Sequence, residues 1–144
     1  METEAHFPPL ESIDPAELLR RARLRPTRQR RALARLLFAG GKRHVTAEAL
    51  FAEAQNANMQ VSLATVYNTL HQFTEAGLLR EVVVNSACTY FDTNVSEHHH
   101  FFHEDQGVLT DISGAEVDIR AIPAAPEGMK ISRVDVIIRL SGRN

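Results

Sequence analysis

The sequence predicts an α+β fold, in which a helical N-terminal domain, residues 1–93, precedes a small α/β, mostly sheet, domain, residues 94–144. Three observations support this division. Apolar residues recur at helical spacing as far as Gly77, strand-like runs begin at Arg80, and the polar segment DTNVSE separates two groups of strands. With 44% hydrophobic and 24% charged residues, the chain has the composition of a globular protein.

The first two expected helices have clear start signals. Asp14 is the N-cap of the first, Pro15 occupies its first turn and Glu17 closes a capping box, which predicts a short helix to about Arg23. Thr27 caps the second helix, whose apolar residues line one side until a pair of glycines ends it.

Two further helices complete the helical part. Thr46 caps the third and Ser62 caps the fourth, where apolar residues recur at i, i+3, i+7 and i+10 until Gly77. These apolar residues form the inward stripe of the fourth helix: Leu63, Val66, Leu70 and Phe73. The opposite face carries small and hydrogen-bonding side chains, where a solvent face would ordinarily carry more Lys and Glu: Ala64, Thr65, Tyr67, Asn68 and His71.

Strand-like sequences follow the helices. REVVV and TYFDT flank the polar turn Asn85-Ser86-Ala87 and predict a hairpin, so the N-terminal domain reads as helices plus a two-stranded ribbon, a winged helix. HHHFFH and GVLTDI predict a second hairpin, RVDVIIRL predicts a strand, and PAAPEG cannot form a regular helix. Because a domain of about fifty residues buries little surface, we expect its sheet to pack against a copy of itself in a homodimer.

The net charge of −2 conceals a strong asymmetry. Residues 1–80 carry 11 basic and 8 acidic residues, whereas residues 81–144 carry 5 and 10. Residues 15–43 alone carry ten basic residues and one acidic residue, Glu17. This density is typical of a surface that faces phosphate, and a solvated helix face is the alternative interpretation.

The fourth helix has the side chains that base recognition needs. Thr65 can contact a thymine methyl group, Asn68 can pair with adenine, and Tyr67 can stack on sugar or thymine while its hydroxyl reaches a phosphate. The alternative is that Tyr67 packs beside the wing in an ordinary helical bundle. We expect the following residues to form the DNA-binding surface: Arg25, Thr27, Arg28, Arg30, Arg31, Ser62, Ala64, Thr65, Tyr67 and Asn68.

Four of the seven histidines lie in the segment SEHHHFFHEDQG. On an extended strand His98 and His100 share one face and His99 points the other way. The single cysteine, Cys88, excludes a zinc site built on cysteine pairs, so any metal must be held by nitrogen and oxygen. The alternative is an accidental histidine run on a surface loop.

The segments RLRPTRQRRALARLLF, HVTAEALF, VSLATVYNTLHQFTEAGLLRE, YFDT and HHHFF resemble the ferric uptake regulator superfamily, and most closely its iron response regulator branch. The resemblance implies a dimeric winged-helix repressor or activator that binds double-stranded operator DNA. It further implies control of iron uptake and haem synthesis genes, haem as the effector, and a haem synthesis enzyme as the haem donor.

The resemblance also implies particular ligands. A divalent ion, Fe, Mn or Zn, falls between the domains on His44, Asp92, His98, His100 and Asp111. A second or haem-binding site falls on His98, His99, His100 and Asp118, with Val134 where a histidine is expected. The family's structural zinc is lost, because the sequence His103-Glu104-Asp105-Gln106 replaces its CxxC motif. Haem would compete with the ion for the same histidines, displace the bridging ligands and weaken DNA binding.

Two other functions remain open at this stage. A histidine and aspartate cluster could serve a metal-dependent hydrolase, although the chain lacks an HExxH motif, and the winged helix could be a ligand-independent binding module. The acidic start METEAHFPPLE is unlike a signal peptide and no apolar run reaches the roughly 20 residues of a membrane span. We therefore expect a cytoplasmic protein with no membrane partner.

Overall fold

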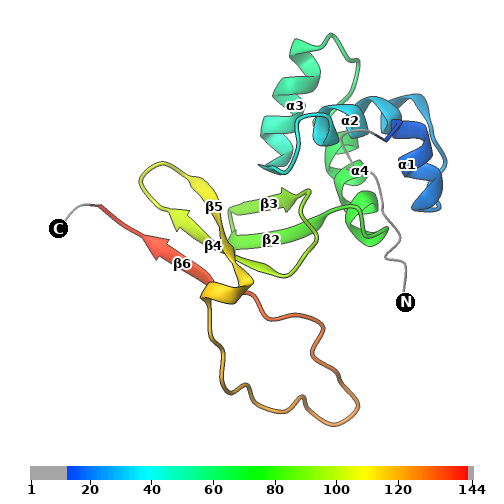
Figure 1. Ribbon diagram of the computed structural model, residues 1–144. Helices are drawn as coiled ribbons and strands as arrows, with labels where there is room; N and C mark the ends of the chain where they lie inside the picture. The colour runs from blue at the N-terminus through cyan, green and yellow to red at the C-terminus, as the bar shows by residue number, and fades with distance from the viewer. Residues whose placement is uncertain (1–12, 143–144) are drawn as a thin grey trace, which may run out of the picture. The chain divides into compact units, whose positions relative to one another are not determined.

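The computed structural model describes residues 13–142, which fall into two compact units that divide between Val95 and Ser96 (Figure 1). The first unit holds seven elements: α1 (Pro15–Arg21), α2 (Arg28–Phe38), β1 (His44–Val45), α3 (Ala47–Asn56), α4 (Leu63–Glu75), β2 (Arg80–Asn85) and β3 (Cys88–Asp92). The second holds β4 (His98–His103), β5 (Val108–Ser113), the 3-10 helix η2 (Gly114–Glu116) and β6 (Ile137–Leu140). The predicted α+β fold is confirmed.

Three of the four predicted helix caps are present. The hydroxyls of Thr27, Thr46 and Ser62 accept hydrogen bonds from backbone N–H groups three residues on, at 3.3, 3.1 and 3.1 Å. Each cap satisfies an N–H that has no partner within its helix.

The capping box predicted for the first helix is wrong. The Asp14 side chain makes no capping hydrogen bond. A capping box would pair the Glu17 carboxylate with the backbone N–H of Asp14. The carboxylate instead pairs with Arg21 Nε at 3.3 Å and lies 3.7 Å from Arg20 Nη1. The helix ends at Arg21, two residues before the predicted end.

The core of the first unit lies where α2, α3 and α4 meet β3. Val66, Leu70 and Phe73, at helical spacing on α4, are fully buried against Leu37 of α2 and Leu50 of α3. Burial of this stripe turns the other face of α4 outward, which is the face that carries Thr65 and Asn68.

The sheet of the first unit has one more strand than the sequence predicts. Its order is β1-β3-β2, all antiparallel, and the pairing places His44 opposite Asp92 and Val45 opposite Phe91. Hydrogen bonds between Arg43 and Thr93 extend this pairing at 3.0 and 2.9 Å. The short strand β1 therefore fixes His44 beside the end of β3.

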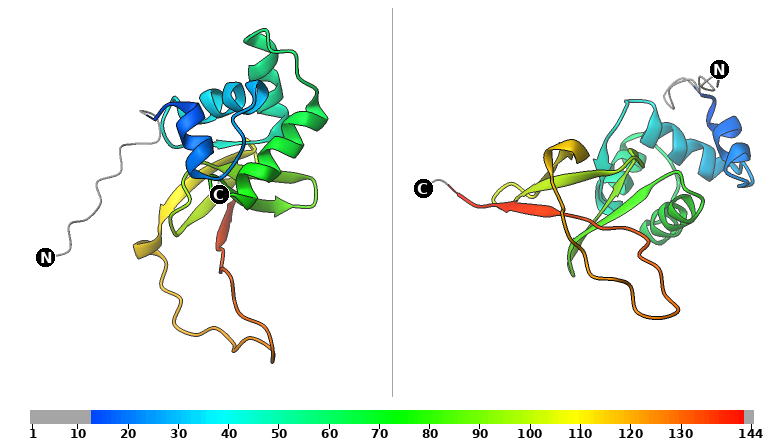
Figure 2. Two further views of the ribbon diagram at one scale, coloured as in Figure 1. Left: turned by 90° about the vertical axis from the view of Figure 1, so that its right-hand side faces the viewer. Right: turned by 60° about the horizontal axis from the view of Figure 1, so that its bottom comes forward.

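The sheet of the second unit has the order β5-β4-β6. The predicted hairpin is present as β4 and β5, and β6 joins β4 in parallel with His100 opposite Ile137. A parallel pair needs a long crossover, which is supplied by residues 117–136 without helix or strand (Figure 2). The predicted strand over RVDVIIRL is shorter, because only Ile137–Leu140 pairs with β4.

Candidate metal ligands and nucleic-acid interface

One pair of potential metal ligands lies in the first unit. His44 Nε2 is 3.3 Å from Asp92 Oδ2, because β1 and β3 place these residues directly opposite each other. The second carboxylate oxygen, Oδ1, accepts a hydrogen bond from the backbone N–H of Asn94 at 2.8 Å. This bond orients the carboxylate, so that Oδ2 faces the imidazole.

Three further ligands lie together in the second unit. His98 Nε2 and His100 Nε2 lie 3.3 and 3.4 Å from the same oxygen, Oδ1 of Asp111. The two imidazole rings are 4.6 Å apart, since alternate residues of β4 share one face and β5 places Asp111 opposite His100. The predicted convergence of His98 and His100 is confirmed.

A backbone carbonyl selects the form of His98 that can bind a metal. Its Nδ1 is 2.7 Å from the carbonyl oxygen of Ser96. A carbonyl can only accept, so Nδ1 carries the proton and the lone pair of the neutral ring is left on Nε2, toward Asp111. This arrangement is typical of a metal-binding histidine supported by its second ring nitrogen.

Two of the four residues predicted for a second or haem site, His99 and Asp118, are engaged elsewhere. His99 Nδ1 accepts a hydrogen bond from the backbone N–H of Val136 at 3.1 Å, so its proton is on Nε2 and neither nitrogen has a free lone pair. The Asp118 carboxylate accepts from Arg120 Nε at 2.9 Å and is exposed. Neither residue joins the ligand atoms of His98, His100 and Asp111.

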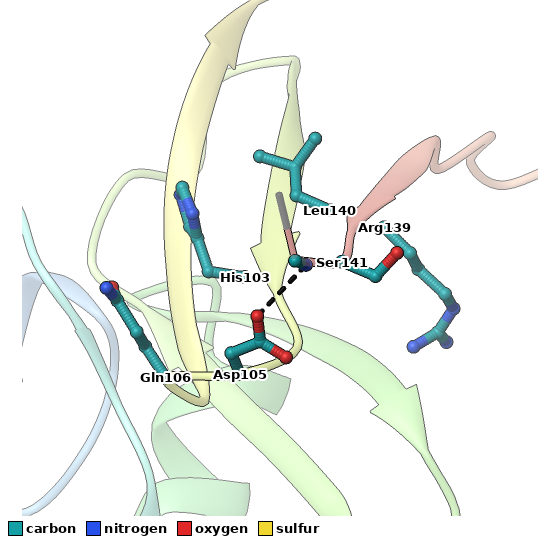
Figure 3. Close-up of a pocket in the computed structure, with 7 residues that line it drawn as sticks. His103, Asp105, Gln106, Arg139, Leu140 and Ser141 are labelled. Carbon is teal, nitrogen blue, oxygen red and sulfur yellow. Dashed lines mark hydrogen bonds between the residues drawn. The ribbon is translucent and has the colours of Figure 1, made fainter. Parts of the chain in front are cut away.

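His103, Asp105 and Gln106 help to line a hollow of about 590 Å³ in the second unit (Figure 3). Asp105 turns toward the end of β6, where its Oδ2 accepts a hydrogen bond from the backbone N–H of Gly142 at 2.9 Å. His103 Nε2 is hydrogen-bonded to the Thr110 hydroxyl at 3.1 Å across the β4–β5 hairpin. Hydrogen bonds thus connect the turn both to its own hairpin and to the chain beyond β6.

The outward face of α4 borders a polar groove of the first unit. The groove has a volume of about 420 Å³ and lies between the start of α2 and α4. The residues that line it are Arg25, Thr27, Gln29, Arg30, Thr65, Asn68, Thr69 and Gln72. Ala64 and Asn68 are exposed, and so are Arg25, Arg28 and Arg31. The hydroxyls of Thr27 and Ser62 serve as helix caps, and Ser62 Oγ also donates to Thr65 Oγ1 at 2.9 Å.

Two further predicted DNA-binding side chains, Arg30 and Tyr67, also have protein partners. Arg30 donates from Nε and Nη2 to Gln72 Oε1 and from Nη1 to the carbonyl of Arg25. The Tyr67 hydroxyl donates to Glu48 Oε1 at 2.7 Å. The sequence did not lead us to predict Gln72 as a partner of Arg30 or Glu48 as a partner of Tyr67. Gln72 could have been found, because it lies four residues after Asn68 on the same helix face.

In the described part of the chain, no helix has the length and apolar character needed to cross a membrane.

A family model and two relatives of similar sequence identify the family of this chain. The ferric uptake regulator family model matches residues 21–139. The peroxide operon regulator of Bacillus subtilis (strain 168) is 32% identical over 117 residues, which are 81% of this chain and 80% of that protein. The peroxide-responsive repressor PerR of Staphylococcus epidermidis is 33% identical over 115 residues, 76% of this chain and 75% of that protein.

Solved structures support the fold. The ferric uptake regulator from Pseudomonas aeruginosa with manganese has a TM-score of 0.70 at 23% identity and covers 92% of this chain and 100% of its own. The ferric uptake regulator of Vibrio cholerae has a TM-score of 0.68 at 19% identity, with coverages of 88% and 98%.

The match over residues 21–139 confirms the predicted superfamily, whereas the iron response regulator branch and haem stay predictions. It also rules out the hydrolase alternative. The chain belongs to the ferric uptake regulator family and is a regulator of transcription, not an enzyme.

Proposed function

We propose that the chain is a metal-responsive regulator that binds double-stranded operator DNA as a homodimer in the cytoplasm. One divalent ion, Fe, Mn or Zn, would control this binding through five ligands: His44, Asp92, His98, His100 and Asp111. The observation that carries the proposal is the presence of two small ligand sets, one in each unit, whose nitrogen and oxygen atoms already converge.

Neither ligand set alone supplies the four or more protein ligands of a closed metal site. A zinc ion takes about four ligands and Fe²⁺ or Mn²⁺ commonly takes more, whereas the first unit supplies the pair and the second unit the trio described above. Only residues 93–97 separate Asp92 from His98. A chain of this length spans at most about 20 Å, so one ion can recruit both sets without unfolding either unit.

The regulatory effect would come from restricting the relative orientation of the two units. Ligands from both units favour one relative orientation, and in a homodimer this orientation sets the separation of the two α4 helices. Half-sites on B-DNA are read about 34 Å apart, so only some orientations allow both helices to enter the major groove. Metal binding and DNA binding are thereby coupled.

The DNA contacts would come from the first unit. Asn68 and Thr65 lie on the outward face of α4 and can reach base edges, while Arg25, Arg28 and Arg31 are exposed and can contact phosphate. The first unit carries the basic half of the chain, which supplies the attraction that does not depend on sequence.

The homodimer would form through the second unit. Strand β6 pairs with β4 on one side only among the described residues, and its Ile138 and Leu140 side chains are 40% and 38% exposed. An edge strand with exposed apolar side chains is a template for pairing with another chain. A twofold axis beside β6 would cover this edge on both copies.

Haem is a second candidate effector of the regulator. The proposed target genes are those of iron uptake and haem synthesis. Haem is favoured by the two converging imidazoles of His98 and His100, either of which could act as an axial ligand, with a haem synthesis enzyme as donor. The names of the two relatives describe a third signal, peroxide. Both would act by removing the same histidines from the divalent ion.

The test measures DNA binding by the apo, Mn²⁺, Fe²⁺, Zn²⁺ and haemin forms, with and without peroxide. The operator is first selected from random duplexes by the metal-loaded protein. We expect a metal ion to raise operator affinity at least about tenfold, and His100→Ala to abolish this gain. His103→Ala is the matched control, because His103 lies on the same strand outside the ligand set. An operator affinity that is equal in all forms would contradict the proposal.

A further inference from the structure

The hydroxyl of Tyr67 has a partner within the protein. It donates to Glu48 Oε1 at 2.7 Å and joins α4 to the first turn of α3. A phenol bound to a carboxylate at this distance forms a charge-assisted hydrogen bond, which is stronger than a bond between neutral groups. The hydrogen bond lowers the pKa of Glu48 and raises that of Tyr67. The predicted use of this hydroxyl, a phosphate contact, would require breaking the bond.

The ring of Tyr67 is also held from its face. It stacks on His71 at a centroid distance of 6.4 Å and an interplanar angle of 20°. His71 in turn meets Phe91 of β3 edge to face at 5.6 Å and 83°. Glu48 at the hydroxyl and His71 at the face together define where the ring lies on α4.

An exposed carboxylate at this position works against DNA affinity. Glu48 lies within hydrogen-bond reach of the proposed base-reading helix, where it repels phosphate. Residues 15–43, which hold the arginines proposed to contact phosphate, carry only one acidic residue, Glu17. A negative charge at this position is therefore expected to have a compensating role.

We propose that Glu48 is a positioning residue for Tyr67, which occupies the hydroxyl and thereby presents the ring, and not the hydroxyl, to the DNA. This inference rests on the proposed DNA binding and specifies one of its contacts. The ring would make apolar contact with a base or sugar, a contact that depends on sequence, whereas a phosphate contact would not. Glu48 would thus lower the total affinity for DNA and raise the discrimination between DNA sequences.

The test compares affinities for the selected operator and for a shuffled duplex. Glu48→Ala is expected to lower the ratio of these two affinities about fivefold, the equivalent of one lost hydrogen bond. Glu48→Gln keeps an acceptor oxygen and should retain the ratio within about twofold. Tyr67→Phe should reproduce the loss, and the double variant should lose no more, because both substitutions break the same bond.

Two comparisons separate positioning from simple repulsion. Glu75→Ala removes an exposed charge from the same helix without touching Tyr67, and should leave the affinity ratio unchanged. If Glu48→Ala and Glu48→Gln both raise the two affinities by one common factor, Glu48 merely repels DNA and the proposal is wrong.

A failure of the proposed function gives a different result. If the wild-type chain selects no sequence from random duplexes, both the DNA binding and this inference are overturned. If it selects one and Glu48→Ala keeps the full ratio, only the inference is overturned. Glu48 is exposed, so these variants should fold, which circular dichroism can verify.

Discussion

Arg30 donates two hydrogen bonds to the side-chain oxygen of Gln72, from Nε at 3.2 Å and from Nη2 at 3.0 Å. Its third nitrogen, Nη1, donates to the carbonyl of Arg25 at 3.0 Å. One guanidinium therefore connects α2, α4 and the segment before α2. This arginine, which the sequence suggested as a phosphate ligand, has the contacts of a side chain that holds α4, the proposed base-reading helix, in place.

The salt dependence of DNA binding should distinguish the two roles. A phosphate contact contributes about −0.9 to the slope of log affinity against log salt. We expect Arg28→Ala, at an exposed position, to reduce the slope by about this amount. Arg30→Ala should lower operator affinity while the slope stays nearly constant. A slope that falls by about one for Arg30→Ala would assign Arg30 to the phosphates after all.

The phenol of Tyr67 should titrate above its usual range. Its pKa is raised by the hydrogen bond to Glu48, and the other tyrosine, Tyr90, has a pKa raised to about 12, chiefly by burial. Alkaline titration of phenolate absorbance should show both tyrosines ionising late, and Glu48→Ala should lower the pKa of Tyr67 alone. A Tyr67 pKa that is unaffected by Glu48→Ala would show that the bond does not persist in solution.

The same bond gives a stability prediction with a defined sign. The pKa of Tyr67 is higher in the folded state than in the unfolded chain, where a tyrosine titrates near 10. Its stabilising contribution is therefore complete below about pH 10 and is lost as the pH rises through the folded-state pKa. Unfolding of the wild type and of Tyr67→Phe should differ at neutral pH and converge in strong alkali.

Asp105 should stabilise the second unit. Its carboxylate accepts the backbone N–H of Gly142 and so connects the β4–β5 turn to the chain that follows β6. We expect Asp105→Ala to reduce the free energy of unfolding by about 1 kcal/mol. Glu104→Ala, at the neighbouring exposed position, is the control. Equal thermal unfolding of the two variants would show that the Asp105 bond contributes nothing specific.

A charge on β6 should prevent dimerisation. Leu140→Glu places a carboxylate on the exposed edge strand proposed as the interface, so sedimentation at micromolar concentration should find a monomer. Met129→Glu changes a side chain that is 70% exposed in the crossover and should leave the dimer intact. A Leu140→Glu variant that remains dimeric would place the interface elsewhere.

Local signals predicted much of the first unit. Thr27, Thr46 and Ser62 cap their helices because a hydroxyl and the N–H it satisfies are only three residues apart. The apolar stripe of α4 was equally readable, since Val66, Leu70 and Phe73 repeat at the helical period.

Longer-range relationships were not readable from the sequence. Strand β1 has two residues, too few for any periodicity, and is defined only by its pairing with β3. The partners of Arg30 and Tyr67 are 42 and 19 residues away in the chain, so no local pattern specifies them. The convergence of His98 and His100 followed from strand alternation, whereas the proximity of Asp111 depends on the register of the hairpin.

The proposed bridging ion is tested most directly by metal affinity in variants of each unit. Competition titration of Mn²⁺ or Zn²⁺ should show that His44→Ala, in the first unit, and His100→Ala, in the second, each weaken the binding of one ion about tenfold or more, while His103→Ala does not. If His44→Ala binds the ion as tightly as the wild type, the second unit holds it alone and the account is contradicted.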